Sequence, residues 1–327
     1  MDSPTLSIVV PMHDESAVIE AFHDRLTTVL DATGLTFEVV CVNDGSRDDT
    51  LLRLEWLHAH DSRFKVIDLS RNFGKEAALT AGIDHASGEA VIPFDADLQD
   101  PPEVILELVS RWREGFDVVY ATRLEREGES YLKRWTAAAF YRVMQRLTPV
   151  PIPADTGDFR LMSRPVVEAL REMRERHRFM KGLFSWVGFR QTSVPYRRDP
   201  RVAGTTKFNY WKLWNLAVEG ITSFSFIPLQ LASFLGFLVA VCAIGYGLFM
   251  LVRTLVSGNA VPGYPSLMVT VLFLGGVQLM TLGIIGEYVG RIYNESKHRP
   301  IYLVRRRWGI GTPGNSSEAV GRAGGPA

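Results

Sequence analysis

The sequence predicts an α/β domain with a mostly parallel sheet, followed by a pair of membrane-spanning helices. In the first two-thirds of the 327-residue chain, short β-branched apolar runs alternate with amphipathic segments. This alternation is typical of a parallel sheet that carries helices on both faces. Further along, residues 220–252 and 254–286 contain no charged side chain, and uncharged stretches of this length are typical of membrane spans.

Four apolar runs are expected to be buried parallel strands, because each is short and bounded by polar turns. They are residues 6–11, 37–44, 64–69 and 90–95. The segments between them have helix-like periodicity: residues 15–32, 48–60 and 75–86. Ser46 or Asp48 is expected to cap the second helix. Ligands of such a sheet bind beyond the carboxyl ends of its strands, so functional residues are expected directly after each strand.

The composition favours no highly charged partner, because 36 basic residues balance 36 acidic ones, and we expect no nucleic acid to bind. Neither Cys41 nor Cys242 belongs to a metal-binding spacing, and two unpaired thiols fit a reducing compartment. The first residues have no basic region followed by an apolar core, so they are expected to form a strand rather than a signal peptide.

The second part of the chain is expected to be a hairpin at residues 228–290, with spans at about 228–252 and 266–288. Each span is long enough to cross about 30 Å of hydrocarbon. Lysines and arginines flank the hairpin, but its loop has none after Arg253. This asymmetry predicts a multi-pass protein of the inner (plasma) membrane, with head and tail in the cytoplasm.

Flanking segments complete the predicted organisation. Residues 1–207 are expected to be the catalytic domain and 208–227 an amphipathic helix. This helix and the basic aromatic segment 131–148 either belong to a soluble core or lie at the membrane interface. The nearby hydrophobic spans favour the interface. Residues 291–327 are expected to be a basic tail, disordered from about 311.

Paired carboxylates follow the fourth expected strand, in the segment Asp95-Ala96-Asp97-Leu98-Gln99-Asp100. Two carboxylates one residue apart suit a hard divalent cation that bridges two phosphates. An acidic strand-to-helix turn is the structural alternative for this motif by itself. Polar clusters also follow the other three strands, and all four are expected to line one crevice.

The motifs together resemble family 2 glycosyltransferases of the GT-A fold, in the branch that acts on polyprenyl phosphates. The matching segments are VVPMHDE, VNDGSRDDT, LSRNFGKEAAL, FDADLQDPPE, TGDFRLM and RVAGTTKF. The resemblance implies a membrane-bound hexosyltransferase that uses a nucleotide sugar and Mg²⁺ or Mn²⁺. It implies that Pro11, Glu15 and Asp44 contact the nucleoside, and that Asp95 and Asp97 hold the sugar nucleotide and metal, with Gln99 as a candidate further ligand. Ser46 and Lys75, in two of these clusters, are further candidates for nucleotide-sugar binding.

Asp158 is the candidate catalytic residue beside Asp97. The family resemblance makes Asp158 the base of an inverting displacement. A phosphate monoester is already largely dianionic at neutral pH, so Asp158 either removes a proton, orients the acceptor or Arg160, or forms a structural turn. Arg123 and Arg134 are the candidate ligands of the acceptor phosphate, since guanidinium groups bind phosphate bidentately.

A glycine-containing loop is expected to close over the donor diphosphate through Arg201 and Lys207. Attraction of these two residues to anionic lipid is the alternative. In the second span, Gly286 and Gly290 form a small-xxx-small pair that predicts helix contact, within the hairpin or between protomers of a dimer or tetramer. A flippase is a candidate downstream partner.

UDP-glucose is the preferred donor, on the resemblance to bacterial members with two spans. GDP-mannose, UDP-N-acetylhexosamine and a modified pentose are alternatives, and undecaprenyl or decaprenyl phosphate both fit as acceptors. The product would serve as a sugar donor for the cell envelope. A processive polysaccharide synthase is disfavoured, because two spans cannot enclose a glycan channel and the chain has no Gln-x-x-Arg-Trp segment. An inactive nucleotide-sugar-binding scaffold is disfavoured because Asp97 and Asp158 are present.

Overall fold

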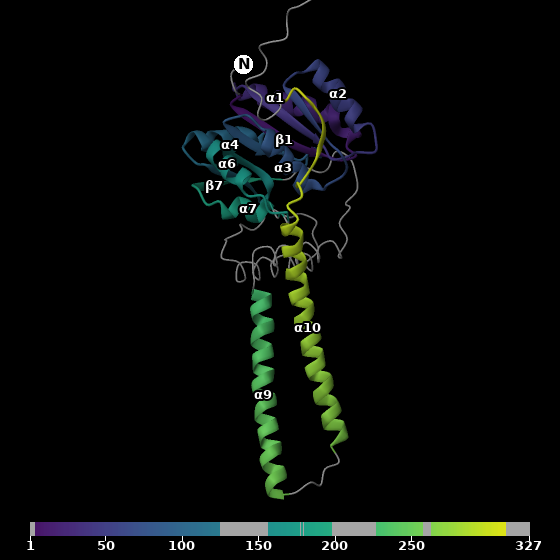
Figure 1. Ribbon diagram of the computed structural model, residues 1–327. Helices are drawn as coiled ribbons and strands as arrows, with labels where there is room; N and C mark the ends of the chain where they lie inside the picture. The colour runs from purple at the N-terminus through teal and green to yellow at the C-terminus, as the bar shows by residue number, and fades with distance from the viewer. Residues whose placement is uncertain are drawn as a thin grey trace, which may run out of the picture. The chain divides into compact units, whose positions relative to one another are not determined.

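The structure is a computed structural model in two compact units, one built on a sheet and the other on two long helices (Figure 1). It describes the following residues: 4–124, 156–176, 178, 180–197, 227–257 and 263–311.

Four parallel strands form the centre of the sheet, as the sequence predicts. They are β1 (Leu6–Met12), β2 (Phe37–Asn43), β3 (Phe64–Leu69) and β4 (Ala90–Pro93). The connecting helices include those predicted between them: α1 (Ile19–Ala32), α2 (Thr50–His60) and α3 (Lys75–His85), with the short 3-10 helix η1 (Ser16–Val18) before α1. Because all four strands run the same way, their carboxyl ends lie along one edge of the sheet.

A second group of strands extends the sheet beyond β4. These strands are β5 (Val118–Arg123), β6 (Thr156–Ser163) and β7 (Gln191–Tyr196). β6 is antiparallel to both β4 and β5, so this side of the sheet is mixed. Further helices belong to the same unit: α4 (Val104–Arg113), α6 (Arg164–Glu172) and α7 (Met180–Trp186). The strand order among the described residues is β7-β5-β6-β4-β1-β2-β3-β8.

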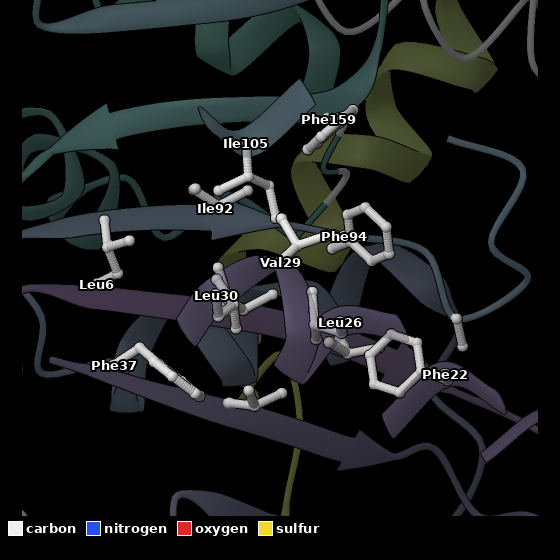
Figure 2. Close-up of a cluster of buried hydrophobic side chains, with 14 of the residues drawn as sticks. Leu6, Phe22, Leu26, Val29, Leu30, Phe37, Ile92, Phe94, Ile105 and Phe159 are labelled. Carbon is white, nitrogen blue, oxygen red and sulfur yellow. The ribbon is translucent and has the colours of Figure 1, made fainter. Parts of the chain in front are cut away.

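A buried apolar cluster holds the sheet and its helices together, and Figure 2 shows part of it. Phe22 and Leu26 of α1 and Ile92 of β4 are fully buried members of this cluster. Phe94 at the end of β4 contacts Phe159 of β6 edge to face, with ring centroids 5.2 Å apart. Burial of one such side chain stabilises the folded state by about 1.5–3 kcal/mol relative to leaving it exposed. The cluster therefore holds the strands, and with them their ends, in place.

The last strand, β8 (Val304–Trp308), pairs antiparallel with β3 at the sheet edge. The side chain of Arg305 donates a hydrogen bond to the Ser70 carbonyl at 2.5 Å. The Tyr302 hydroxyl donates to Asp84 at 2.7 Å. The sequence predicts only a basic tail here, so this strand is a finding of the structure.

The second unit contains two long helices, α9 (Ile227–Ser257) and α10 (Tyr264–Ser296), which contact each other. Both are long and apolar enough to cross a membrane, and both extend beyond the predicted span limits. Many of their large apolar side chains are exposed, including Phe237 at 68% and Leu279 at 73%. Lipid is a favourable surrounding for such surfaces, whereas water is not.

The glycine pair of α10 has open space around it in the described part of the hairpin. A Cβ built on Gly286 or Gly290 meets no atom within 4 Å in the described part of the chain. Contact within the hairpin through these two positions is therefore absent from that part. Contact between protomers stays a prediction.

Candidate active site

Asp44 lies at the end of β2 and binds the backbone that follows β3. Its buried carboxylate accepts hydrogen bonds from the N–H groups of Phe73 at 2.7 Å and Gly74 at 2.9 Å. Gly45 is required in this turn, because its φ is +63° and a Cβ would lie 2.5 Å from the Asn72 nitrogen. The loops after β2 and β3 are thus held against each other.

The loop after β1 is joined to the loop after β2 in the same way. Ser46 accepts a hydrogen bond from the Asp14 N–H at 3.1 Å, and the hydroxyl of Thr50 accepts one from the Glu15 N–H at 2.9 Å. Asp48 accepts the N–H of Thr50 at 3.0 Å. Three of the four predicted polar clusters therefore lie side by side. The cap position of α2 is Asp49, which makes no side-chain capping hydrogen bond, so the expected cap at Ser46 or Asp48 is wrong.

Lys75 joins the third cluster to the fourth. Its ammonium lies 2.7 Å from Asp95, after β4, and 2.9 Å from Asp158, on β6. Although burial works against its charge, Asp158 and Asp95 raise the pKa of Lys75, so it stays protonated. The exposed fraction falls from 46% for Lys75 to 13% for Asp158, so the site is open at the lysine and closed behind Asp158.

The charges around Asp158 keep its carboxylate ionised. Burial alone would raise its pKa, but the charges of Lys75 and Lys181 and the hydrogen bond from Lys75 hold the pKa below its usual range. Its second carboxylate oxygen is buried and accepts no hydrogen bond from the described residues. Asp158 is therefore ionised throughout the physiological pH range.

In the turn after β4, partly exposed residues alternate with buried ones. Asp95, Asp97 and Gln99 are partly exposed, whereas the residues between them are buried. The Gln99 side-chain oxygen is shielded from solvent and accepts no hydrogen bond from any described residue. Such an orphaned oxygen beside two carboxylates is what an oxygen-preferring cation such as Mg²⁺ or Mn²⁺ needs. No cluster of three His, Cys, Asp or Glu side chains suited to a metal occurs among the described residues, so further ligands would come from bound phosphates and water.

Arg123 lies at the end of β5, beside the same turn. It donates a hydrogen bond to the Tyr196 hydroxyl at 3.1 Å, and Tyr196 donates to the buried Asp100 at 2.5 Å. Burial works against its charge, but Tyr196 and Asp100 raise the pKa of Arg123. Gly157 is packed against Arg123, since a Cβ there would lie 3.3 Å from the guanidinium. These contacts hold Arg123 next to Gly157, the residue before Asp158.

The structure thus brings the predicted residues Glu15, Asp44, Ser46, Lys75, Asp95, Asp97, Gln99, Arg123 and Asp158 to one edge of the sheet. Pro11 lies within β1, one residue before the strand ends. Three predicted residues, Arg134, Arg201 and Lys207, lie outside the described residues.

Two site residues were not predicted from the sequence, Glu76 and Lys181. Glu76 follows Lys75 in α3 and accepts a hydrogen bond from the Met180 N–H at the start of α7. Burial and the nearby charge of Asp158 raise the pKa of Glu76 to about 8. The charge pair Lys75–Glu76 at a helix start was the available signal, but it is equally typical of a solvated first turn.

Comparison with known proteins agrees with this geometry. The model for glycosyl transferase family 2 matches residues 7–171, and that for the GtrB C-terminal hairpin matches residues 227–292. The chain belongs to glycosyltransferase family 2, and it is a glycosyltransferase with a GT-A-like fold.

Two relatives are similar along nearly their whole length. An uncharacterized glycosyltransferase of Synechocystis is 55% identical over 93% of this chain and 96% of its own. The bactoprenol glucosyl transferase of Shigella phage SfV is 50% identical over 92% of this chain and 98% of its own. Among solved structures, glucosyl-3-phosphoglycerate synthase from Mycobacterium tuberculosis with Mn²⁺, UDP and phosphoglyceric acid is 23% identical over 67% of this chain and 76% of that one, with a TM-score of 0.43.

Proposed function

We propose that the protein transfers glucose from UDP-glucose to a polyprenyl phosphate, with inversion at the anomeric carbon. The observation that carries this proposal is the similarity to a bactoprenol glucosyl transferase, which extends through both the sheet domain and the hairpin. The convergence of Asp44, Lys75, Asp95 and Asp158 at one sheet edge supports it, because that edge is where such folds bind nucleotides.

The donor would bind across the ends of β1, β2 and β4. Asp44 and Glu15 would contact the nucleoside. Asp95, Asp97 and the Gln99 oxygen would hold Mg²⁺ or Mn²⁺, which supplies positive charge to the diphosphate when bound. We assign Arg201 and Lys207 to the diphosphate from the sequence alone.

The acceptor would enter from the side of Asp158 and Arg123. A phosphate oxygen of the lipid forms a new bond to the anomeric carbon, while the bond from that carbon to the nucleoside diphosphate breaks. The bonding electron pair leaves with the diphosphate. Because the lipid phosphate is already largely dianionic at neutral pH, the reaction needs little proton transfer, and Asp158 would position the acceptor and the cations around it.

The test is transfer by purified full-length protein. It should convert polyprenyl phosphate to a polyprenyl phosphate hexose with UDP-glucose, detected by mass spectrometry of the lipid. GDP-mannose, UDP-N-acetylglucosamine and a UDP-pentose form the comparison panel, and unphosphorylated polyprenol is the acceptor control. Transfer from another donor alone would replace the assignment of glucose, and no transfer from any donor would refute the proposed reaction.

We also propose that the sheet domain lies in the cytoplasm, with α9 and α10 both crossing the inner membrane. The pairing of β8 with β3 supports an even number of crossings, because chain on both sides of the hairpin contributes to one sheet. The absence of basic residues from the hairpin loop after Arg253 supports this orientation.

Cysteine labelling tests this orientation in intact cells. A cysteine replacing Asn259, between the two helices, should react with an impermeant reagent added outside. A cysteine replacing Ser316 should react only after the cells are opened, and the unmodified chain with Cys41 and Cys242 gives the background. The reverse labelling pattern would contradict the cytoplasmic assignment.

A further inference from the structure

Lys181 lies in the first turn of α7, which packs against β6, the strand that carries Asp158. The residue before it, Met180, donates its backbone N–H to Glu76. The side chain of Lys181 is partly buried, and the charged groups that affect it most are Asp158 and then Arg123. Burial lowers the pKa of Lys181, while Asp158 opposes this effect. The ammonium group of Lys181 is therefore partly dehydrated and lies within electrostatic reach of Asp158.

The other cations around Asp158 already have partners. Lys75 is bound by Asp95 and Asp158, and Arg123 by Tyr196. Arg160 donates to the Gly157 carbonyl at 2.8 Å. Lys181, by contrast, donates no hydrogen bond and forms no ion pair within the described part of the chain.

The acids nearby do not neutralise Lys181. Asp158 is shared with Lys75, which lies 2.9 Å from it. Burial and the charge of Asp158 raise the pKa of Glu76 to about 8, which favours its neutral form. An ammonium group that is partly desolvated and lacks a direct counter-ion is prepared to bind an incoming anion.

The groups around Lys181 indicate which of the two phosphate-bearing substrates it would bind. The donor diphosphate belongs with Asp95 and Asp97 beyond β4, and the attacking oxygen must approach the anomeric carbon from the opposite face. Asp158 and Arg123, the groups that affect Lys181 most, lie on the proposed acceptor side. An acceptor with close to two negative charges is bound better with a further cation than by Arg123 and the predicted Arg134 alone.

We propose that Lys181 binds the phosphate group of the lipid acceptor, together with Arg123. This assignment rests on the proposed function and adds a residue to its acceptor site. In the resting enzyme, Lys181 and Asp158 interact only at longer range; the phosphate completes the hydrogen bonding of the ammonium group. The side chain of Lys181 thereby favours phosphorylated polyprenol over the free alcohol.

The experiment compares the full-length wild type with Lys181→Met, Lys181→Gln and Lys181→Arg. We expect loss of the ammonium group to raise KM for polyprenyl phosphate about 10- to 100-fold, the usual effect of one hydrogen bond to a charged group. The affinity for UDP, measured by calorimetry, should change less than about twofold. Lys181→Arg should recover part of the loss, and Lys181→Gln replaces Lys181→Met if the latter does not fold.

Arg53→Met is the matched control, because Arg53 is an exposed cation on α2 outside the site. Direct binding of polyprenyl phosphate and of unphosphorylated polyprenol is measured in parallel. Wild-type binding of the phosphate without transfer would refute the proposed reaction but still test Lys181. A variant that keeps the wild-type preference for the phosphate, or that loses UDP affinity instead, would overturn the assignment of Lys181. If the wild type itself does not prefer the phosphate, both proposals fall.

Discussion

Replacing Asp158 with asparagine is expected to lower kcat by about 100- to 1,000-fold, with nearly the same loss at every pH between about 5.5 and 8.5. Asp158 is mostly buried, bound to Lys75 at 2.9 Å, and kept ionised by neighbouring positive charges. A carboxylate with a pKa below its usual range is a weak base toward a phosphate whose second pKa is near 6. Its loss would instead leave Lys75 and Lys181 without the anion that positions them.

The measurement is kcat and KM for both substrates across this pH range. Asp31→Asn is the control, because Asp31 forms a surface ion pair with Arg63 outside the site and should change kcat by less than about twofold. If Asp158 were the base, the deficit would be largest at low pH, where the acceptor is a monoanion, and would shrink as the pH passes about 6. A deficit that shrinks tenfold over that interval would contradict the positioning role.

Replacing Asp97 with alanine is expected to reduce turnover by at least about 1,000-fold, comparable to removing the divalent cation. Asp97 lies on the partly exposed side of the turn after β4, between Asp95 and Gln99. Chelation by EDTA should abolish transfer by the wild type, and Mg²⁺ or Mn²⁺ should restore it. The variant should stay inactive at saturating metal.

Binding of Mn²⁺ in the presence of UDP, followed by electron paramagnetic resonance, gives a reading independent of turnover. It should weaken in Asp97→Ala and remain unchanged in Glu103→Gln, since Glu103 is a nearby surface carboxylate paired with Arg25. Full activity of the wild type in chelator, or normal Mn²⁺ binding by Asp97→Ala, would refute the metal assignment.

The parts of the fold that the sequence predicts are those with local signals. The strands β1 to β4 are apolar and buried on both faces, so their short runs identify them without knowledge of their partners. Parallel strands also place their following loops at one edge, which is why the polar clusters were expected to converge. The contacts of Asp44 and Lys75 confirm that convergence.

The parts that were missed depend on contacts distant in sequence. β8 contains three arginines in five residues, and such a segment is typical of a basic tail until the edge of β3 is available to pair with it. Lys181 and Glu76 lie in helices, where charged residues usually face solvent. The packing of α7 against β6 brings Lys181 near Asp158, and no spacing in the sequence indicates that packing. Glu76 comes near Asp158 through α3, where it follows Lys75.

During synthesis, β3 leaves the ribosome long before β8, and both long helices lie between them in the chain. Until β8 arrives, β3 has an open edge whose unpaired N–H and C=O groups favour association with other chains. The entropic cost of closing a loop rises only slowly with its length. The long chain between β3 and β8 therefore adds little to the free-energy cost of pairing them. A soluble fragment that stops before α9 would retain the open edge permanently, since the strand that covers it is encoded beyond the membrane segment.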